Sequence, residues 1–235
     1  MGRAHDRAAL AGGALAVASL HAGPALCAWS PALRRALAVR DRATSAGAVA
    51  LTFDDGPHPR GTPATLAALQ RLGVPATFFL VGEQVERDPA LAGEIVAAGH
   101  EVGVHCDRHR NLLWLSPAQV REDLARAEAA IVSATGRTPR LYRPPYGVLT
   151  SAGLVHARRR GWQPLLWTRW GHDWRARATP ASIASEATAD LAGGEVLLLH
   201  DADHYSAPGS WQRTVAALSR VIEEIERAGL TVGST

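Results

Sequence analysis

The sequence predicts an α/β fold built on a parallel sheet. From residue 48 onward, short apolar runs of strand length alternate with longer stretches of helix length. Glycine follows most of the predicted helices, and Ser-Pro or Thr-Pro begins two of them. Such an alternation places successive strands side by side and in the same direction. The pattern alone leaves open whether the sheet is open or closed into a barrel.

The individual elements follow from these signals in chain order. Short apolar runs next to turn residues predict strands at Val49–Asp54, Ala76–Val81, Glu101–Val104, Leu165–Thr168 and Val196–His200. The longer segments predict helices at Thr62–Leu72, Gln84–Ala98, Pro117–Thr135, Ser151–Arg160, Pro180–Leu191 and Trp211–Ala228. Ser116 and Thr179 each precede a first-turn proline, so we expect both to be helix N-caps.

Composition is compatible with one domain, which we place at residues 48–235 of the 235-residue chain. The 25 basic residues are all arginines, they are dispersed, and the net charge is only +3. The densest cluster, Arg158–Arg160, lies at a predicted helix C-terminus, where cations are favoured. We therefore expect no nucleic-acid partner, and we expect a monomer. Two cysteines, Cys27 and Cys106, indicate no disulfide framework.

The N-terminal segment has the pattern of a targeting sequence. Arg3 and Arg7 precede an alanine-rich apolar run that extends to Trp29. Residues 1–29 are therefore predicted to be a signal peptide or, if uncleaved, a membrane anchor, since about 20 apolar residues can span a bilayer. Residues 30–47 would follow as a linker or covering helix. The expected location is secreted or membrane-anchored, with membrane contact through this segment only. A soluble alanine-rich helix packed on the domain is the alternative.

The most informative motif is Leu51–Pro57, where two adjacent carboxylates end a predicted strand. Asp54 and Asp55 would point in different directions in a regular strand. A bend at the strand end, with conformational freedom supplied by Gly56, would bring both to one site. One acid could then bind a metal while the other moves a proton. A turn with two solvated aspartates is the alternative interpretation.

A histidine pair provides the matching nitrogen ligands. His105 and His109 have the i, i+4 spacing that places two side chains on one face of a helical turn, close enough to share one ion. A carboxylate from elsewhere would complete a set of two histidines and one aspartate. Such a set leaves a coordination position open, as a catalytic metal site requires.

Three further segments carry polar residues in constrained surroundings. Leu141–Gly147 contains Arg143 beside two prolines, which restrict the backbone around it. Trp167–Trp174 is rich in tryptophan and contains Asp173, and Glu195–Asp201 is an apolar strand that ends in His200. In α/β sheets and barrels, catalytic residues gather at the C-terminal ends of strands.

These five segments, in this order, resemble the polysaccharide deacetylase family, also called carbohydrate esterase family 4. The resemblance covers roughly residues 48–201. It implies a distorted (β/α) barrel of about seven parallel strands with an open substrate groove. It also implies an enzyme that removes N-acetyl groups from N-acetylglucosamine units of a polysaccharide, with peptidoglycan or a chitin-like polymer as the substrate. The Trp-rich segment favours a sugar, because aromatic faces stack on pyranose rings, and a place in the core is the alternative for these tryptophans.

The resemblance also implies a role for each motif residue. Asp54 matches the catalytic base, and Arg143 the arginine that orients it. His200 matches the general acid, and Asp173 the carboxylate that tunes it. The backbone N–H of Tyr146 matches the donor to the oxyanion. The implied metal ligands are Asp55, His105 and His109, and the implied pocket residues are Trp174, Leu198 and Pro145.

The implied cofactor is a divalent metal, Zn²⁺ first, with Co²⁺ or Ni²⁺ as alternatives. Two other functions stay open. One is a metal-dependent amidohydrolase acting on a small amide, whose family relatives usually lack part of the metal triad. The other is a non-catalytic carbohydrate-binding relative, which should have lost Asp54, a metal ligand or His200.

The chain departs from the family pattern at two positions. Cys106 stands where the family usually has Ser or Thr after the first metal histidine, so a hydroxyl hydrogen bond is lost or weakened, and a thiol could itself ligate. Trp170 stands where many members carry another acid, which puts the details of the groove in doubt.

Overall fold

The computed structural model describes residues 19–235, so the N-terminal run predicted to be a signal or anchor lies mostly outside the described residues. Within residues 19–235, no helix combines the length and apolarity needed to cross a bilayer.

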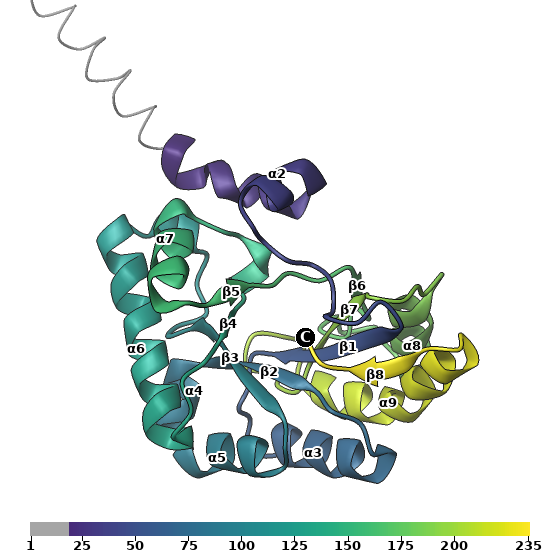
Figure 1. Ribbon diagram of the computed structural model, residues 1–235. Helices are drawn as coiled ribbons and strands as arrows, with labels where there is room; N and C mark the ends of the chain where they lie inside the picture. Colours follow the sequence, from purple (N-terminus) through teal and green to yellow (C-terminus); the bar gives the residue numbers. More distant parts are fainter. Residues whose placement is uncertain (1–18) are drawn as a thin grey trace, which may run out of the picture.

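The chain forms a curled sheet with helices around its outer side (Figure 1). The strands are β1 (Ala48–Asp54), β2 (Thr77–Val81), β3 (Glu101–Cys106), β4 (Leu141–Tyr142), β5 (Gln163–Pro164), β6 (Arg169–Trp170), β7 (Val196–His200) and β8 (Thr231–Gly233). The α-helices are α2 (Pro31–Ala36), α3 (Gly61–Leu72), α4 (Gly82–Arg87), α5 (Pro89–Ala97), α6 (Pro117–Thr135), α7 (Ser151–Arg160), α8 (Pro180–Thr188) and α9 (Ser210–Arg227), and the 3₁₀ helices are η1 (Gly23–Ala28), η2 (Leu112–Trp114) and η3 (Pro145–Gly147).

All strand pairings in the sheet are parallel, which confirms the predicted fold class. Seven strands follow the order β5-β4-β3-β2-β1-β7-β6, and β8 pairs with β1. Strand β8 pairs with the first residues of β1 and β2 pairs with the last, so these two strands share one edge of β1. The path curls strongly into a half-barrel, in agreement with the distorted barrel of about seven strands implied by the sequence (Figure 1).

An extended stretch after α2 connects the two sides of the half-barrel. The Arg40 N–H donates to the Pro164 carbonyl at the end of β5, at 2.9 Å, and the Ala43 N–H donates to the Gly194 carbonyl before β7, also at 2.9 Å. Isolated bridges from Arg40 and Arg42 accompany these bonds. Part of segment 30–47 is therefore hydrogen-bonded into the barrel wall.

The inner and outer faces of the sheet have separate apolar clusters. The inner cluster contains Ala50, Phe79, Leu141, Leu165 and Val196. The outer cluster contains the intervening strand residues, such as Val49, Leu51, Phe53, Phe78 and Leu80, packed against the helices. Because side chains alternate along a strand, the inward face continues past the inner cluster towards the C-terminal strand ends. The inward positions reached there are Asp54, His105, Arg143, Leu198 and His200.

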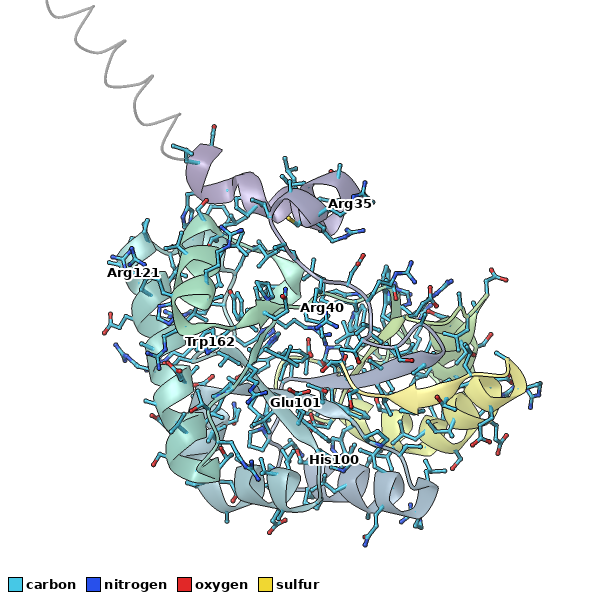
Figure 2. The ribbon with its side chains drawn as sticks, viewed as in Figure 1. Arg35, Arg40, His100, Glu101, Arg121 and Trp162 are labelled. Atoms are coloured by element: carbon cyan, nitrogen blue, oxygen red, sulfur yellow. The ribbon has the colours of Figure 1, made fainter. Side chains whose placement is uncertain are left out.

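Helices cover the outer face of the sheet and direct their polar residues to solvent. Helix α6 packs on α4, α5 and α7, and α9 packs on α3 and α8. Figure 2 shows Arg121 on the outer side of α6, while Arg35 and Arg40 belong to α2 and to the stretch after it. The predicted bounds of α6 and α7 agree with the structure to the residue.

The predicted helix Gln84–Ala98 is wrong as a single element. The structure divides it into α4 and α5 at Asp88-Pro89. Proline lacks the N–H that a continuous helix would need, and its ring clashes with the preceding turn. Asp88 caps the second helix instead, because its Oδ1 accepts the Leu91 N–H at 3.3 Å.

The predicted strand Leu165–Thr168 is also wrong. These residues lie between the two-residue strands β5 and β6. The carbonyls of Leu165 and Leu166 accept hydrogen bonds from the Arg143 side chain, at 3.1 and 3.3 Å, so they are directed at the guanidinium and not along a regular ladder. Strands β4 and β8 were not predicted, since two or three residues are too few to show a periodicity.

The capping box of α6 gives a test of local stability. The Ser116 Oγ accepts the Gln119 N–H, and the Gln119 side chain accepts the Ser116 N–H. We expect Ser116→Ala to lower the free energy of unfolding by about 1 kcal/mol, as measured by urea denaturation. Ser133→Ala, on the exposed face of the same helix, is the control and should be neutral or slightly stabilising. Equal losses in the two variants would contradict a specific capping effect.

Candidate active site

Strand β1 ends at Asp54, and the backbone bends at the second aspartate, Asp55, as expected. The bend occurs at Asp55 itself, which has a φ of 78°, whereas Gly56 does not have a positive φ. The expectation that Gly56 supplies the conformational freedom is therefore wrong. Gly56 is required for space, because a Cβ at this position would lie 2.7 Å from both carboxylate oxygens of Asp201.

Asp54 faces a fully buried arginine. The Arg143 Nη1 donates to Asp54 Oδ1 at 2.8 Å and to Thr52 Oγ1 at 2.7 Å. The rest of the guanidinium donates to the Leu165 and Leu166 carbonyls. With donors on several sides, Arg143 cannot rotate without losing partners, so it fixes the direction of the Asp54 carboxylate.

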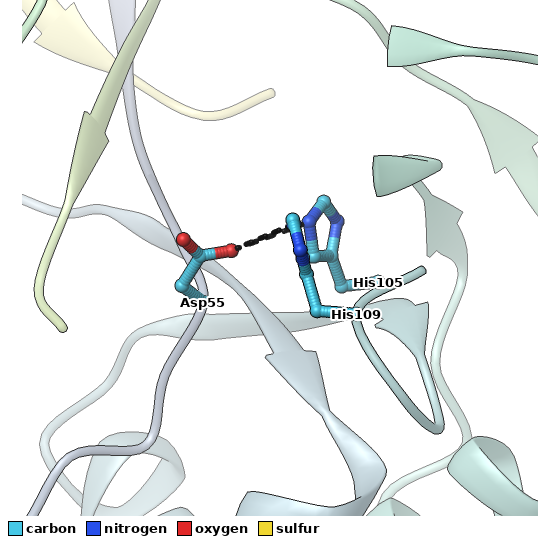
Figure 3. A group of neighbouring side chains, drawn as sticks. All are labelled: Asp55, His105 and His109. Atoms are coloured by element: carbon cyan, nitrogen blue, oxygen red, sulfur yellow. Dashed lines mark ion pairs between the residues drawn. The ribbon is translucent and has the colours of Figure 1, made fainter. Parts of the chain in front are cut away.

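The second aspartate faces two imidazoles and forms a group that can hold a metal ion (Figure 3). The Asp55 Oδ1 lies 3.5 Å from His105 Nε2 and 3.3 Å from His109 Nε2. Two ligands bound at about 2.0–2.1 Å to a tetrahedral zinc ion would lie about 3.3–3.4 Å apart. Asp55 Oδ1 is buried without a hydrogen-bond partner among the described residues, as expected of an atom whose partner is an ion. The three residues therefore fit a divalent metal.

The two histidines reach this group in a different way from the one predicted. His105 is the penultimate residue of strand β3, and His109 lies in the loop that follows, so the expected helical turn is wrong. The carboxylate of Asp123 on α6 shapes this loop by accepting the backbone N–H groups of Asp107, at 2.8 Å, and Arg108, at 3.4 Å. The two histidines are therefore brought together by a loop that is hydrogen-bonded to the Asp123 side chain, and not by a helical turn.

The protonation states of these groups suit metal binding. The His105 Nδ1 lies 2.7 Å from the Arg143 carbonyl, which can only accept, so the proton belongs on Nδ1 and Nε2 is free to ligate. Burial alone would raise the pKa of Asp55, but its contact with His105 and the nearby imidazoles lower it to about 2. Burial lowers the pKa of His109 to about 4. At neutral pH Asp55 is therefore a carboxylate and His109 is a neutral imidazole.

His200 approaches the other carboxylate oxygen of Asp55 and, unlike His109, is protonated at neutral pH. Its Nδ1 lies 2.9 Å from Asp173 Oδ1, and its Nε2 lies 4.0 Å from Asp55 Oδ2. Burial alone would lower the pKa of His200, but the Asp173 carboxylate raises it to about 10. Asp173 is held by the His200 N–H at 2.7 Å and by the Thr214 hydroxyl at 2.8 Å. His200 therefore carries a proton at neutral pH and can donate it.

A cavity of about 300 Å³ lies over these groups. Of the three predicted pocket residues, Trp174 and Leu198 line it, whereas Pro145 is buried and is absent from the lining. The neighbouring Tyr146 lines the cavity instead, in η3, with a φ of 60°. The complete lining is Asp54, Asp55, His105, His109, Tyr146, Trp167, Trp174, Leu198, His200, Tyr205 and Ser206.

Three lining residues, Trp167, Tyr205 and Ser206, were not assigned a role from the sequence. Trp167 begins the Trp-rich segment, so its aromatic composition was the available signal. Tyr205 and Ser206 follow β7 closely, at the strand edge where functional residues gather, and this position was the only sequence signal for them.

Cys106 remains outside the metal group. Its side chain is fully buried, and burial raises the pKa of its thiol well above the usual value. A protonated thiol is a poor metal ligand. The group able to hold an ion among residues 19–235 consists of Asp55, His105 and His109.

Comparison with known proteins identifies the family. Residues 41–164, more than half of the chain, match the family described as polysaccharide deacetylase. The chain belongs to the polysaccharide deacetylase family. A chitooligosaccharide deacetylase from a Bradyrhizobium strain is 38% identical over 191 residues, which are 78% of this chain and 87% of that protein.

Solved structures of polysaccharide deacetylases have the same fold. The structure of a peptidoglycan N-acetylglucosamine deacetylase superposes with a TM-score of 0.79 at 28% identity, over 87% of this chain and 94% of the other. A pseudoenzyme of carbohydrate esterase family 4 from Bacillus anthracis superposes with a TM-score of 0.72 at 28% identity, over 80% of this chain and 63% of the other. Membership of the family is therefore compatible with both active and inactive proteins, and the residues of the site must decide.

The His200–Asp173 pair gives a prediction of pH-dependent stability. The pKa of His200 is about 10 in the folded protein against an ordinary value of 6.5, so the pair stabilises the fold fully below pH 6.5. This contribution is lost as the pH rises towards 10. We expect the free energy of unfolding of the metal-free protein, measured with urea, to fall between about pH 6.5 and 10. Asp173→Asn should remove this part of the decrease, and an identical pH dependence in both proteins would contradict the assignment.

Proposed function

We propose that this protein removes N-acetyl groups from N-acetylglucosamine units of a polysaccharide by metal-dependent hydrolysis. The observation that supports this most directly is the arrangement of three units around one cavity. A carboxylate paired with Arg143, a protonated histidine paired with Asp173, and an Asp-His-His group all line or border it. Amide hydrolysis needs a base, an acid and an electrophile within reach of one bond, and these units are of suitable type for each role.

The residues of the chain divide the work as follows. Asp54, aimed by Arg143, is placed to accept the proton of the attacking water. His200, which holds a proton at neutral pH, is placed to donate it to the leaving amine. A divalent cation held by Asp55, His105 and His109 supplies Lewis acidity, which polarises a carbonyl group and acidifies water.

The walls of the cavity position the substrate and its developing charge. The turn at Tyr146 is fixed by hydrogen bonds from the Gly147 and Val148 N–H groups to the Pro144 and Pro145 carbonyls, at 3.0 and 3.1 Å. We assign the Tyr146 N–H as the donor to the tetrahedral oxyanion, a role that requires a rigid backbone. Leu198 provides an apolar wall suited to an acetyl methyl group, and Trp174 packs edge-on against His200, with ring centroids 5.5 Å apart.

The alternative of a non-catalytic binding protein predicts the loss of at least one reacting residue. The family includes a pseudoenzyme of similar fold, so this alternative has a precedent. In this chain Asp54, the three metal ligands and His200 are all present, and their side chains meet at one cavity. A complete metal triad likewise favours a sugar substrate over a small amide.

For substrate, metal and location, we propose peptidoglycan first and chitin-type oligosaccharides second, with Zn²⁺ as the ion and Co²⁺ or Ni²⁺ as alternatives. The similar proteins include a peptidoglycan deacetylase and a chitooligosaccharide deacetylase, which supports this pair of substrates. An aspartate with two histidines suits several first-row ions. The basic start and apolar run of residues 1–29 support export or anchoring, which would bring a monomeric enzyme to envelope polymers.

Two variants should separate metal binding from proton transfer. Asp54→Asn should keep its metal content and lose about 10²- to 10⁴-fold in turnover, because only the base is removed. His109→Ala should lose both metal and turnover, because a ligand is removed. Elemental analysis of the purified variants, together with acetate release, checks this. Equal metal loss in the two variants would mean that the roles of Asp54 and its neighbours have been exchanged.

The reaction itself is tested by acetate release from peptidoglycan, chitin oligomers and simple amides. We expect release from at least one of the two polymers, its abolition by a chelator, and its recovery when Zn²⁺ or Co²⁺ is added. Full activity of the metal-free protein would refute the metal role. Turnover confined to the simple amides would refute the polysaccharide assignment.

A further inference from the structure

His109 differs from His105 in how its ring is held. Metal-binding histidines usually donate their second ring N–H to an oxygen, which fixes the ring. His105 follows this pattern through the Arg143 carbonyl, at 2.7 Å. The His109 Nδ1 is buried and has no hydrogen-bond partner in the described part of the chain. Another interaction must therefore keep the His109 ring directed at Asp55.

Aromatic side chains surround the His109 ring. Tyr205 stacks on one face of it, with ring centroids 4.4 Å apart and planes 14° apart. Tyr146 meets it edge-on, with centroids 4.7 Å apart and planes 70° apart. Offset or T-shaped contacts at these distances are the favoured geometries of aromatic pairs. Tyr205 thus covers the His109 face with nearly parallel geometry, and it also lines the cavity.

Tyr205 is itself anchored at its hydroxyl group. The hydroxyl donates to Glu83 Oε1 at 2.8 Å and accepts from Gln84 Nε2 at 3.0 Å. Both partners belong to the first turn of α4, and Gln84 is buried. The Glu83 N–H also donates to the Asp107 carbonyl in the histidine loop, at 3.0 Å. The same helical turn therefore holds both the stacking ring and the loop that carries His109.

From this geometry we propose that Tyr205 is a positioning residue for the metal ligand His109. Its ring takes the place of the hydrogen bond that His109 lacks, and the first turn of α4 fixes that ring through its hydroxyl. The proposal deepens the proposed function, because it rests on the Asp55, His105 and His109 metal group. Tyr205 contacts a ligand and takes no part in the proton transfers assigned to Asp54 and His200.

The test is the affinity of the full-length protein for Zn²⁺ alone, measured by competition with a chromophoric chelator, and the visible spectrum of the Co²⁺ form. We expect Tyr205→Leu to raise the Kd for Zn²⁺ by about 10- to 100-fold, the usual effect of removing a residue that orients a ligand. The Co²⁺ bands should shift as well, since the ligand field changes with the direction of the His109 ring. Tyr205→Phe, which keeps the ring, should have a Kd closer to the wild type than to the Leu variant.

Trp114→Leu is the control, because Trp114 is 85% exposed and the same kind of truncation there should leave the Kd unchanged. Circular dichroism of the metal-free proteins checks folding. Tyr205→Met, whose flexible, unbranched side chain adapts to the space left by the ring, replaces the Leu variant should that one fail to fold. An unchanged Kd in Tyr205→Leu or Tyr205→Met would overturn the proposal. Equal losses in the Phe and Leu variants would also overturn it, since the ring would then not be the cause. If the wild type bound neither Zn²⁺ nor Co²⁺, the assignment of the metal group would fail, and the proposal with it. If the wild type released acetate and the Tyr205 variants bound Zn²⁺ as tightly as it does, only the role of Tyr205 would be refuted.

Discussion

The buried guanidinium of Arg143 is the interaction on which the rest of the site depends. Its side chain binds Asp54, Thr52 and the carbonyls of Leu165 and Leu166, while its own carbonyl accepts from His105. A fully buried cation is tolerated only when it is paired and hydrogen-bonded, so these partners cannot move independently. One residue thereby fixes the proposed base on β1 and a proposed metal ligand on β3. The same demand interrupts the sheet between β5 and β6, because two carbonyls there serve Arg143.

Two adjacent aspartates have separate electrostatic surroundings because the chain turns sharply at Asp55. Asp54 continues the inward face of β1 and meets a cation, whereas Asp55 turns into a group of imidazoles. The histidines around Asp55 then differ according to their second partners. His200 has the Asp173 carboxylate and stays protonated, while His109 has no such partner and is neutral at pH 7. The same residue type can in this way serve as the proposed acid at His200 and as a proposed metal ligand at His109.

The sequence predicted the features that depend on local signals. Helices α6 and α7 were located to the residue, since glycine follows each of them and a Ser-Pro pair begins α6. The roles of the motif residues came from the resemblance of five segments to the family, and alternation along the strands then brings Asp54, Arg143 and His200 to one edge of the sheet. The break at Asp88-Pro89 was readable from the proline and was missed. The break at Leu165–Thr168 was not readable, because its cause is an arginine more than twenty residues earlier.

The supporting residues escaped prediction for a related physical reason. A ligand or a base is limited to a few residue types, whereas a residue that orients it is limited only by shape and by the partners within reach. The hydroxyl of Tyr205 meets Glu83 across 122 residues of sequence, and no local pattern encodes that contact. Among the groups assigned to the reaction, His105 lies in strand β3 and is fixed by the sheet, but His109 lies in a loop. The hydrogen bonds of a sheet hold a ligand that lies in a strand, whereas a ligand in a loop must be held by other interactions. For His109 these are the hydrogen bonds from the loop backbone to Asp123 and the stacking of the Tyr205 ring.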